Sequence, residues 1–443
     1  MGTSTVRPLT DDELARLPMA RAAMEAAGRG NAAGRFNFFA AFDGTRNDKD
    51  NLKRSGDPYP TNVGRLFDQA ERRKSATFAP KYYPGVGTGG DQGELGRAAF
   101  WPTPAIDAAA EKAYGDFVEA SRRYLNSHPG ATPADLSASV TGFSRGCATA
   151  VRFAQRLNAQ GLVSPDGAVI APPGSVPVTA MALMDPVATG VQGELGIPPN
   201  VRGRVLVVQG QHEHRDLFRP LDYRGDPRVV AVQHPGNHVG VGGGYDRHGT
   251  AANVLEGLTG YFQASGLPLA NVPPELRHDP GQRPLLRTEA YQTARNGEVT
   301  TDELGKPHLQ WSEDDPSRPR VEVRPRVSPA HQAWLQQAYA ALAPGLQAEG
   351  MSPAQCLQVS AACVASAATH GDWGDPRRFL LSKDRAAAAV QHENGRFEEL
   401  RVDEALQHSA DAHLERAQQA QTTMRASPPE HVAPARAEAV IAR

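Results

Sequence analysis

Short apolar runs alternate with longer amphipathic segments between residues 35 and 265 of the chain. The runs that we predict to be strands span 35–42, 81–83, 136–141, 176–184, 204–209 and 228–233. The segments that we predict to be helices span 61–72, 106–126, 147–157 and 253–264. Strands that alternate with helices in this way build a mainly parallel sheet covered on both faces. The pattern therefore predicts an α/β fold for residues 35–265.

Three further regions lie outside this alternation. Residues 1–34 form a polar, alanine-rich helical segment that we expect to be loosely attached. Residues 266–327 are rich in Pro, Arg, Asp and Glu and show little periodicity, which is typical of a linker or a partly ordered arm. Residues 328–443 regain periodicity and are long enough to form a separate small α+β domain. Its predicted elements are helices opening at 328 and 352, a hairpin of 378–391 with 396–402, and a helix over 403–423.

The strand predicted at 136–141 leads directly into the pentapeptide Gly-Phe-Ser-Arg-Gly at 142–146. In a nucleophile elbow, the glycines of Gly-x-Ser-x-Gly leave room for a strained backbone, and the serine hydroxyl is exposed above the sheet. The pentapeptide alone is a weak signal, but a strand before it and a small-residue helix after it are the context that the motif requires. We therefore predict that Ser144 is a catalytic nucleophile, with a glycine-rich turn as the alternative.

A serine hydroxyl becomes a good nucleophile only beside a base that is oriented by an acid. Asp185 follows a predicted buried strand, at the same sheet edge as the serine, and is our candidate acid; a simple turn residue is the alternative. His238 lies in a glycine-rich loop after the last predicted strand and is the candidate base, with His234 as its main rival. Asp216 is the fallback acid, although its arginine neighbours favour a surface ion pair.

The oxyanion of an acyl-transfer reaction needs two fixed N–H donors. The backbone N–H of Arg145, which follows the serine, is one candidate. The backbone N–H of Gly44 or Thr45, in the turn after the first predicted strand, is the other. Asp43 is then expected to bond its own turn and fix these amides; a metal site formed by Asp43 with Asp48 is the less favoured interpretation.

A glycine-rich segment at 84–90 follows the short strand predicted at 81–83. It lacks the Gly-Lys-Ser/Thr ending of a phosphate-binding loop, so we interpret it as a flap near the serine. Phe100 and Trp101 lie just beyond it and are candidate lipid-contacting residues. Ordinary core packing is the alternative for these two aromatic side chains.

Cysteine is sparse in the chain. The cysteines are Cys147, Cys356 and Cys363. Three thiols at this spacing suit neither a disulfide framework nor a thiolate zinc site, which favours a protein made in a reducing cytoplasm. The run His-Glu-His at 212–214 lacks the His-Glu-x-x-His spacing of a metalloprotease helix. We expect no metal and no cofactor, and leave a calcium requirement open.

The net charge and the hydropathy of the chain bear on three further properties: nucleic-acid binding, a secretory signal and a membrane span. The formal net charge is -2 over 443 residues, which argues against a chain-wide electrostatic contact with nucleic acid. The first 35 residues contain acidic side chains and no continuous apolar segment, so we expect no ordinary secretory signal. No apolar run reaches the ~18 residues that span a bilayer. If the protein leaves the cell, another export route must recognise it.

Six ordered motifs together resemble one family. They are Phe-Asp-Gly-Thr-Arg-Asn at 42–47, Thr-Asn-Val at 61–63, Tyr-Tyr-Pro-Gly-Val-Gly-Thr-Gly at 82–89, the pentapeptide at 142–146, Asp-Pro-Val at 185–187, and the segment 235–245 that begins Pro-Gly-Asn-His. Residues 35–265 thus resemble the α/β-hydrolase domain of the first class of type VI lipase effectors, which are bacterial phospholipases delivered into rival cells. The resemblance implies a triad of Ser144, Asp185 and His238.

Two departures from the family pattern affect the neighbours of the presumed triad. The family usually has Asp-Thr-Val at the acid, where this chain has Asp-Pro-Val at 185–187. It usually has His-Ser-Asp-Val at the base, where this chain has His-Val-Gly-Val at 238–241. The predicted catalytic residues are present, and substrate preference stays open.

The C-terminal domain, residues 328–443, resembles the recognition domain of antibacterial type IV secretion effectors, which docks on the coupling ATPase. The similarity rests on Asp-Pro-Ser-Arg-Pro at 315–319, Phe-Leu-Leu-Ser at 379–382, Ala-Val-Gln at 389–391 and the glutamine-rich tail. It implies a coupling ATPase as partner and export without a signal peptide. A helical lid or a dimerisation module is the alternative.

These inferences combine into one expected function. We expect a secreted antibacterial serine lipase of the phospholipase A type, made in the bacterial cytoplasm and acting in the envelope of a target cell. Its partners would be membrane phospholipid, the type IV coupling ATPase and a cognate immunity protein, and not nucleic acid. The alternatives are a soluble carboxylesterase or peptidase, and a non-enzymatic adaptor built on a hydrolase scaffold.

Overall fold

The computed structural model describes residues 5–55, 58–88, 101–213, 218–244, 249–288, 321–323, 328–408 and 410–426. The chain divides into two units, Met1–Arg326 and Val327–Arg443. Within the described residues, no helix combines the length and the apolar character needed to cross a bilayer.

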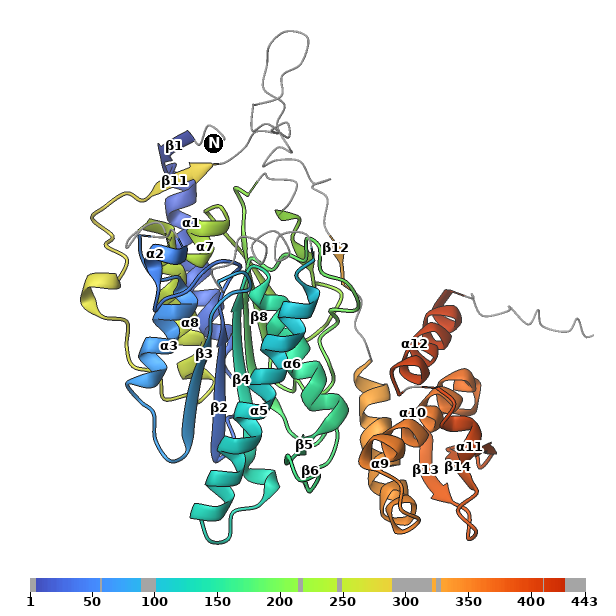
Figure 1. Ribbon diagram of the computed structural model, residues 1–443. Coiled ribbons are helices and arrows are strands. Elements are labelled where there is room, and N and C mark those ends of the chain that lie inside the picture. Colours follow the sequence, from blue (N-terminus) through green and yellow to red (C-terminus); the bar gives the residue numbers. More distant parts are fainter. Residues whose placement is uncertain are drawn as a thin grey trace, which may run out of the picture. The chain divides into compact units, whose positions relative to one another are not determined.

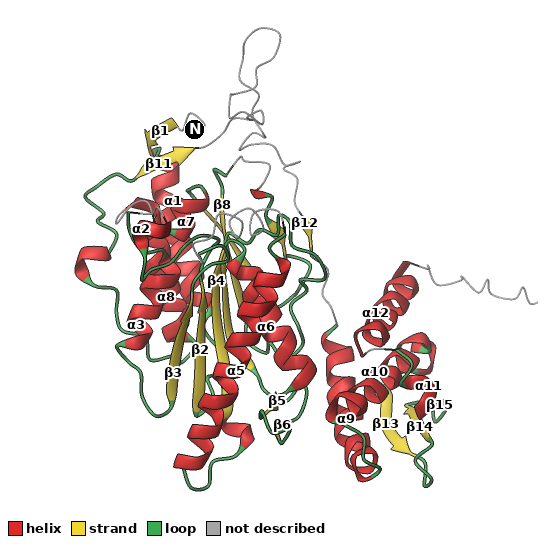
Figure 2. Ribbon diagram, viewed as in Figure 1, coloured by secondary structure: helices red, strands yellow, loops and turns green. Residues whose placement is uncertain are grey.

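A six-stranded sheet forms the centre of the first unit (Figure 1; Figure 2). Its strands, in spatial order, are β10 (Val229–His234), β8 (Val205–Gly210), β7 (Val178–Met184), β4 (Leu136–Phe143), β2 (Phe36–Phe42) and β3 (Phe78–Tyr83). Every neighbouring pair is parallel. The inner strands β8, β7, β4 and β2 are buried along their whole length, as parallel strands covered on both faces must be. The predicted α/β fold with a mainly parallel sheet is confirmed.

Helices cover the two faces of this sheet (Figure 1). One face carries α5 (Thr103–Ser127) and α6 (Gly146–Gln160), and the other carries α1 (Asp11–Ala27), α3 (Asn62–Glu71) and α8 (Gly249–Ala264). Successive side chains of β2 alternate between the faces. Phe38 stacks on Phe117 of α5 at 5.0 Å between ring centroids, whereas Phe39 meets Phe262 of α8 edge-on at 5.2 Å.

The N-terminal helix α1 is an integral part of the first unit. Thr10 caps it, and the side chain of Glu13 closes the capping box by accepting the N–H of Thr10. Met24 is fully buried, and its side chain packs against the backbone of Gly257 in α8. Arg21 forms an ion pair with Glu256 at 2.8 Å. The expectation of a loosely attached segment is therefore wrong, because few but well-placed apolar residues dock this helix onto the sheet.

Parts of the predicted linker also belong to the first unit. The strand β11 (Leu285–Thr288) pairs antiparallel with β1 (Thr5–Pro8). The short strand β12 (Val321–Glu322) pairs in parallel with β9 (Leu221–Asp222). The backbone pairing at both places supplies order that the Pro-rich and charge-rich composition did not indicate. The segments 289–320 and 324–327 lie outside the described residues.

The described part of the second unit contains three long helices and a three-stranded antiparallel sheet. Its elements are α9 (Pro329–Ala348), α10 (Pro353–Thr369), β13 (Pro376–Leu381), β14 (Ala387–His392), β15 (Phe397–Arg401), α11 (Val402–Ala405) and α12 (Ala410–Ala426). Ser328 caps α9 and Ser352 caps α10, as the Ser-Pro pairs predicted. The stretch 378–391, predicted as one strand, is divided by a turn in which Arg385 has φ 57° and Ser382 accepts the N–H of Ala387.

The remaining helices, strands and turns of the described residues are short. They are α2 (Leu52–Ser55), α7 (His238–Gly242), β5 (Leu162–Val163), β6 (Val169–Ala171) and short 3-10 turns at Pro133–Asp135, Pro274–Leu276 and Gly371–Trp373. The final helix was predicted to begin at residue 403. It is instead split into α11 and α12, with a turn between them.

Candidate active site

The turn between β4 and α6 is a strained elbow. Ser144 has φ 55°, a left-handed conformation that costs free energy for a residue with a side chain. Both glycines of the pentapeptide are required by close contacts. A Cβ atom on Gly142 would lie 2.7 Å from the carbonyl oxygen of Gly146, and one on Gly146 would lie 2.4 Å from the carbonyl oxygens of Phe42 and Asp43. The two glycines therefore allow β2, β4 and α6 to meet directly beneath the serine.

Asp185 lies beside the elbow because β7 is the parallel neighbour of β4. Phe143 and Met184 are register partners, and the N–H of Ser144 donates to the carbonyl of Met184 at 3.0 Å. The residues that follow each strand are thus adjacent at the carboxyl edge of the sheet. Asp185 is 1% exposed, has φ 38°, and accepts the N–H of Gly210 on Oδ1 at 2.9 Å.

His238 is the first residue of α7 and is joined to this aspartate. Its Nδ1 lies 2.6 Å from Oδ2 of Asp185. The ring of His238 lies against two aromatic rings, Phe143 at 4.5 Å and Phe218 at 4.7 Å between centroids. Because a carboxylate only accepts hydrogen bonds, the shared proton is on Nδ1, which leaves Nε2 as the basic nitrogen.

The structure therefore joins two of the three predicted triad residues by a hydrogen bond and sets the third beside them. Ser144 directly follows Phe143, whose ring packs on the imidazole of His238. Among the hydrogen bonds of the described residues, none connects Ser144 Oγ with His238 Nε2. Catalytic hydrogen bonds are commonly long without substrate and shorten in the substrate complex. The arrangement provides a buried acid, an oriented imidazole and a hydroxyl on a strained turn at one edge of one sheet.

The rival base and the fallback acid differ from this pair in their positions. His234 is fully buried, and its Nε2 lies 3.0 Å from Oδ1 of Asn253 on α8. Burial lowers the pKa of His234 to about 4, so this residue is a neutral part of the core at physiological pH. Asp216 and His214 lie outside the described residues.

The turn after β2 is held by Asp43. Its carboxylate accepts the N–H of Gly44 at 2.8 Å, the hydroxyl of Thr61 at 2.8 Å and the hydroxyl of Tyr82 at 2.7 Å. Burial and the adjacent carboxylate raise the pKa of Tyr82, which keeps its hydroxyl protonated as a donor. Asp43 therefore bonds its own turn, as expected from the sequence. No group of three or more His, Cys, Asp or Glu side chains suited to a metal ion occurs among the described residues.

A second contact ties this turn to the elbow. The guanidinium of Arg145 donates from Nε to the hydroxyl of Thr45 at 2.8 Å. Arg145 also precedes the first residue of α6, so its backbone lies at the positive end of that helix. The N–H of Gly44 is already donated to Asp43, which makes Thr45 the better of the two predicted partners for Arg145 around a developing oxyanion.

Of the two aromatic residues predicted to contact lipid, Trp101 can be described. It is 67% exposed and lies two residues before α5, so the alternative of core packing does not apply to it. Phe100 and the greater part of the adjoining glycine-rich segment lie outside the described residues. A single exposed aromatic side chain is ordinary on a protein surface, so contact of Trp101 with lipid stays a prediction.

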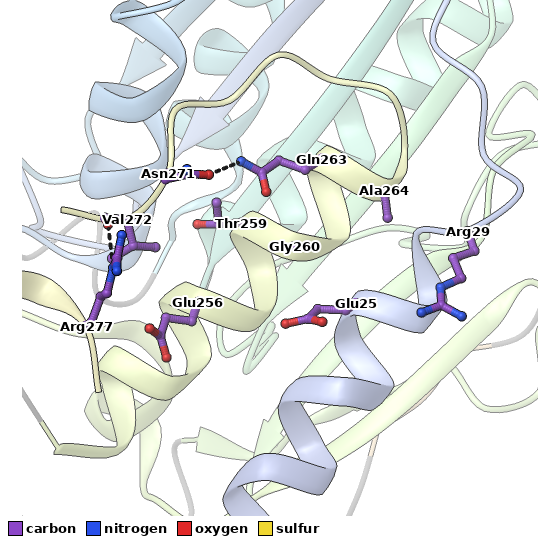
Figure 3. Close-up of a pocket in the computed structure, with 10 residues that line it drawn as sticks. All are labelled: Glu25, Arg29, Glu256, Thr259, Gly260, Gln263, Ala264, Asn271, Val272 and Arg277. Carbon is purple, nitrogen blue, oxygen red and sulfur yellow. Dashed lines mark hydrogen bonds between the residues drawn. The ribbon is translucent and has the colours of Figure 1, made fainter. Parts of the chain in front are cut away.

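A cavity elsewhere in the first unit is separate from these residues (Figure 3). It has a volume of about 410 Å³ and lies between α1, α8 and the loop that follows α8. Charged and amide side chains line it, among them Glu25, Glu256 and Arg277, and Gln263 donates to Asn271 at 3.0 Å across one wall. None of the predicted site residues lines this cavity.

Sequence reasoning missed two acidic residues beside the site. Glu213, three residues after β8, is fully buried and accepts the N–H of His238 on Oε2 at 3.2 Å. Glu13, on α1, binds Nε2 of His212 at 2.8 Å. The position of His212 and Glu213 just beyond a buried strand was a usable signal, since ligands and catalytic groups gather at that edge. The contact from Glu13 had no local signal.

The parallel sheet covered on both faces and the strained elbow after β4 give the first unit the α/β-hydrolase fold, and the buried aspartate–histidine pair lies at the same sheet edge as the elbow. Within that class, residues 37–172 match the family described as T6SS, Phospholipase effector Tle1-like, catalytic domain. This part of the first unit is therefore similar to the catalytic domain of Tle1-like phospholipase effectors.

Several solved structures are also similar. The Tle1 effector bound to the VgrG spike from the Type 6 secretion system matches at 21% identity over 49% of this chain, with a TM-score of 0.38. An uncharacterized protein from Pseudomonas aeruginosa matches at 15% identity over 95% of this chain, with a TM-score of 0.37. The chain spans 52% of the length of the first protein and 64% of the second.

A third solved structure comes from work on the metagenome-derived lipolytic enzymes LipS and LipT. It matches at 11% identity over 48% of this chain and 90% of its own, with a TM-score of 0.27. A search of curated proteins gives no match.

Proposed function

We propose that the chain is a serine hydrolase that cleaves the acyl esters of glycerophospholipids. The observation that carries this proposal is the 2.6 Å hydrogen bond between Asp185 and His238 at the sheet edge where the elbow presents Ser144. Structural ion pairs are usually found on the surface, whereas this pair is buried and directed at a strained turn. A buried acid that orients an imidazole beside a serine is the arrangement of a proton relay.

In the proposed reaction, Oγ of Ser144 attacks the ester carbonyl carbon while its proton passes to Nε2 of His238. Asp185 holds the imidazolium that forms. The carbonyl carbon–oxygen bond to the glycerol then breaks, and His238 returns the proton to the departing alkoxide. A water molecule, activated by the same imidazole, hydrolyses the acyl-serine and regenerates the free hydroxyl.

The developing oxyanion is assigned to two backbone N–H groups, those of Arg145 and Thr45. The contact between the Arg145 guanidinium and the Thr45 hydroxyl fixes the distance between the two turns that carry these amides. Losing one such donor costs about 10²-fold to 10³-fold in kcat in serine hydrolases. The N-terminal end of α6 adds a favourable dipole at the same point.

The substrate class is supported by the family match of residues 37–172, whose description names a phospholipase effector. The exposed side chain of Trp101 fits contact with a lipid surface, since Trp favours the boundary between water and hydrocarbon. Phospholipase A specificity, and a contribution of Phe100, extend the same proposal.

The delivery route is a separate part of the proposal. The family description names type VI secretion, which favours that route over the type IV route inferred from the C-terminal motifs. The family match ends at residue 172 and says nothing of residues 328–443, so a role for the second unit in delivery stays a prediction. We further propose that the producing cell makes a cognate immunity protein and that the target is the envelope of another cell.

Mass spectrometry of lipids tests the activity directly. Phospholipid vesicles are incubated with the wild-type chain or with Ser144→Ala, and fatty acids and lysophospholipids are quantified. We expect Ser144-dependent release of both products, with a loss of at least about 10³-fold in the variant. A chain that cleaves short soluble esters but no phospholipid would be a soluble esterase. Full toxicity of Ser144→Ala in target cells would instead favour the non-enzymatic adaptor.

A further inference from the structure

A tripeptide that follows β8 clamps the loop that carries His238. The backbone N–H of Gln211 donates to the carbonyl of His234 at 3.0 Å, and that of His212 donates to the carbonyl of Gly236 at 3.0 Å. The side chain of Glu213 accepts the N–H of His238 at 3.2 Å. The parallel ladder between β8 and β10 is thereby continued past the ends of both strands, up to the first residue of α7.

The imidazole of His212 is the central link of this clamp. It is 3% exposed, and its Nδ1 accepts the N–H of Gly236 at 3.1 Å. Because a backbone N–H can only donate, Nδ1 must carry a lone pair, and the ring proton must be on Nε2. That Nε2 lies 2.8 Å from Oε1 of Glu13, which accepts the proton. The carboxylate of Glu13 therefore selects the tautomer of His212 that can hold Gly236.

Glu13 is itself rigidly held on the N-terminal helix. Arg7 binds both of its carboxylate oxygens, at 2.6 Å and 2.7 Å, and the N–H of Thr10 donates to Oε2 at 2.7 Å. The hydrogen bond from Arg7, helped by that from the Thr10 amide and by the positive charge of Arg7, outweighs burial and lowers the pKa of Glu13 to about 2. The group that fixes His212 is thus an anion throughout the physiological pH range.

We propose that Glu13 and His212 are positioning residues that hold the His238 loop in its catalytic geometry, so that the N-terminal helix is a working part of the active site. The inference rests on the function proposed above. Without the carboxylate, the ring proton of His212 is free to occupy Nδ1, where it opposes the N–H of Gly236. Gly236 has φ 155°, a conformation open to glycine, and the loop would lose the contact that restrains it.

The test compares two variants of one helix. Glu13→Ala removes the contact to His212, whereas the matched control Arg21→Ala removes the ion pair from the same helix to Glu256 and leaves His212 untouched. With p-nitrophenyl butyrate as a soluble substrate, we expect Glu13→Ala to lower kcat about 10-fold to 100-fold with little change in KM, the size of effect that a misplaced catalytic group produces. Arg21→Ala should retain the wild-type kcat.

The conservative variant Glu13→Gln keeps an oxygen that can accept the Nε2 proton of His212. We expect it to recover most of the kcat lost in Glu13→Ala, although it loses the charge that pairs with Arg7. If Glu13→Gln restores kcat, Glu13 acts by accepting the Nε2 proton of His212. A Glu13→Gln variant as impaired as Glu13→Ala would overturn the tautomer part of the inference.

Hydrogen exchange supplies a readout that does not depend on turnover. Peptides covering 234–241 should exchange about 10-fold faster in Glu13→Ala, the equivalent of one lost hydrogen bond, and at the wild-type rate in Arg21→Ala. Unchanged exchange in Glu13→Ala, or equal acceleration in both variants, would overturn the inference. If the wild-type chain shows no Ser144-dependent ester cleavage, the proposed function fails, while the exchange result still decides whether Glu13 positions the loop.

Discussion

The two units of the chain differ in the polar groups that they bury. Among the described residues, the first unit buries the carboxylates of Glu13, Asp43, Asp185, Glu213 and Asp226. In the described part of the second unit no Asp or Glu is buried as a whole residue, although Oε2 of Glu398 is shielded from solvent 2.7 Å from Nδ1 of His370. The buried titratable side chains there are His331, His392, His413, Cys356 and Cys363. Removing an anion from water is costly unless it is paired and hydrogen-bonded. Folding of the first unit therefore includes a desolvation cost for buried carboxylates, which is smaller in the second unit.

The buried anions of the first unit are concentrated where the proposed chemistry takes place. Asp43, Asp185 and Glu213 follow β2, β7 and β8 and so lie at the carboxyl edge of the sheet. Glu13 lies on α1 and reaches this edge through His212. Asp226 is the exception, because it binds Arg228 at 2.6 Å in a turn before β10. The comparison shows that the groups used in the proposed chemistry belong to the first unit.

The largest expected effect comes from changing the acid without changing its shape. In Asp185→Asn, the amide oxygen can still accept the N–H of Gly210, and Asn tolerates the positive φ at this position. The NH₂ group would then face Nδ1 of His238 and favour the wrong tautomer. We expect kcat for a soluble ester to fall about 10³-fold to 10⁴-fold.

A second buried carboxylate provides the control for that experiment. Asp226→Asn weakens the pair with Arg228, which is remote from the serine in the sheet. We expect it to lower the unfolding temperature and to leave kcat near the wild-type value. Should Asp226→Asn and Asp185→Asn depress kcat equally, the assignment of chemistry to one edge of the sheet would be lost.

An effect of intermediate size concerns the stability of the fold at acid pH. Each unit contains one histidine whose pKa is lowered to about 4. Burial lowers the pKa of His234 in the first unit and of His331 in the second to about 4. Above pH 6.5 these rings are neutral in both folded and unfolded states. Below it the unfolded chain takes up the proton and the folded chain does not. For His234, stability therefore falls by about 3 kcal/mol between pH 6.5 and pH 4.

The variant His234→Gln tests whether His234 controls the acid sensitivity of the first unit. Glutamine can keep the contact to Asn253 and cannot become charged. Hydrogen exchange at pH 7 and pH 4.5, read separately for peptides of each unit, should show a reduced acid sensitivity in the first unit and an unchanged one in the second. Equal acid sensitivity of the first unit with and without the substitution would show that other groups control it.

The sequence predicts most of the sheet because its inner strands are continuous apolar runs. The edge strand β3 is the instructive exception. It begins at Phe78, whereas the predicted strand begins at residue 81, and it contains Pro80 at a ladder position opposite Phe39. Proline is tolerated there since β3 pairs on one side only, with β2. Edge position is a property of the whole sheet and cannot be read from the local pattern.

The candidate site also depends on contacts that the local sequence pattern does not predict. Ser144, Asp185 and His238 each follow a strand, so local pattern and strand order were enough to bring them to one edge. For Glu13, the sequence shows the capping box with Thr10, and that local role accounts fully for the residue. Its second contact, to His212, joins segments about two hundred residues apart and depends on how α1 docks. No periodicity or motif encodes such a contact.

The smallest expected effect comes from removing the second unit. Each unit has core clusters of its own: the first is centred on the two faces of the parallel sheet, and the second on α9, α10 and β14. A unit with its own core can fold independently. A chain ending at residue 326 should therefore keep kcat for p-nitrophenyl butyrate within about twofold of the full-length value.

Circular dichroism establishes whether the shortened chain is folded. A folded chain without activity would mean that the second unit contributes to the site, and the division of labour between the units would have to be abandoned. Retained ester cleavage together with lost toxicity toward target cells would sharpen it, because the second unit would then serve delivery and not chemistry.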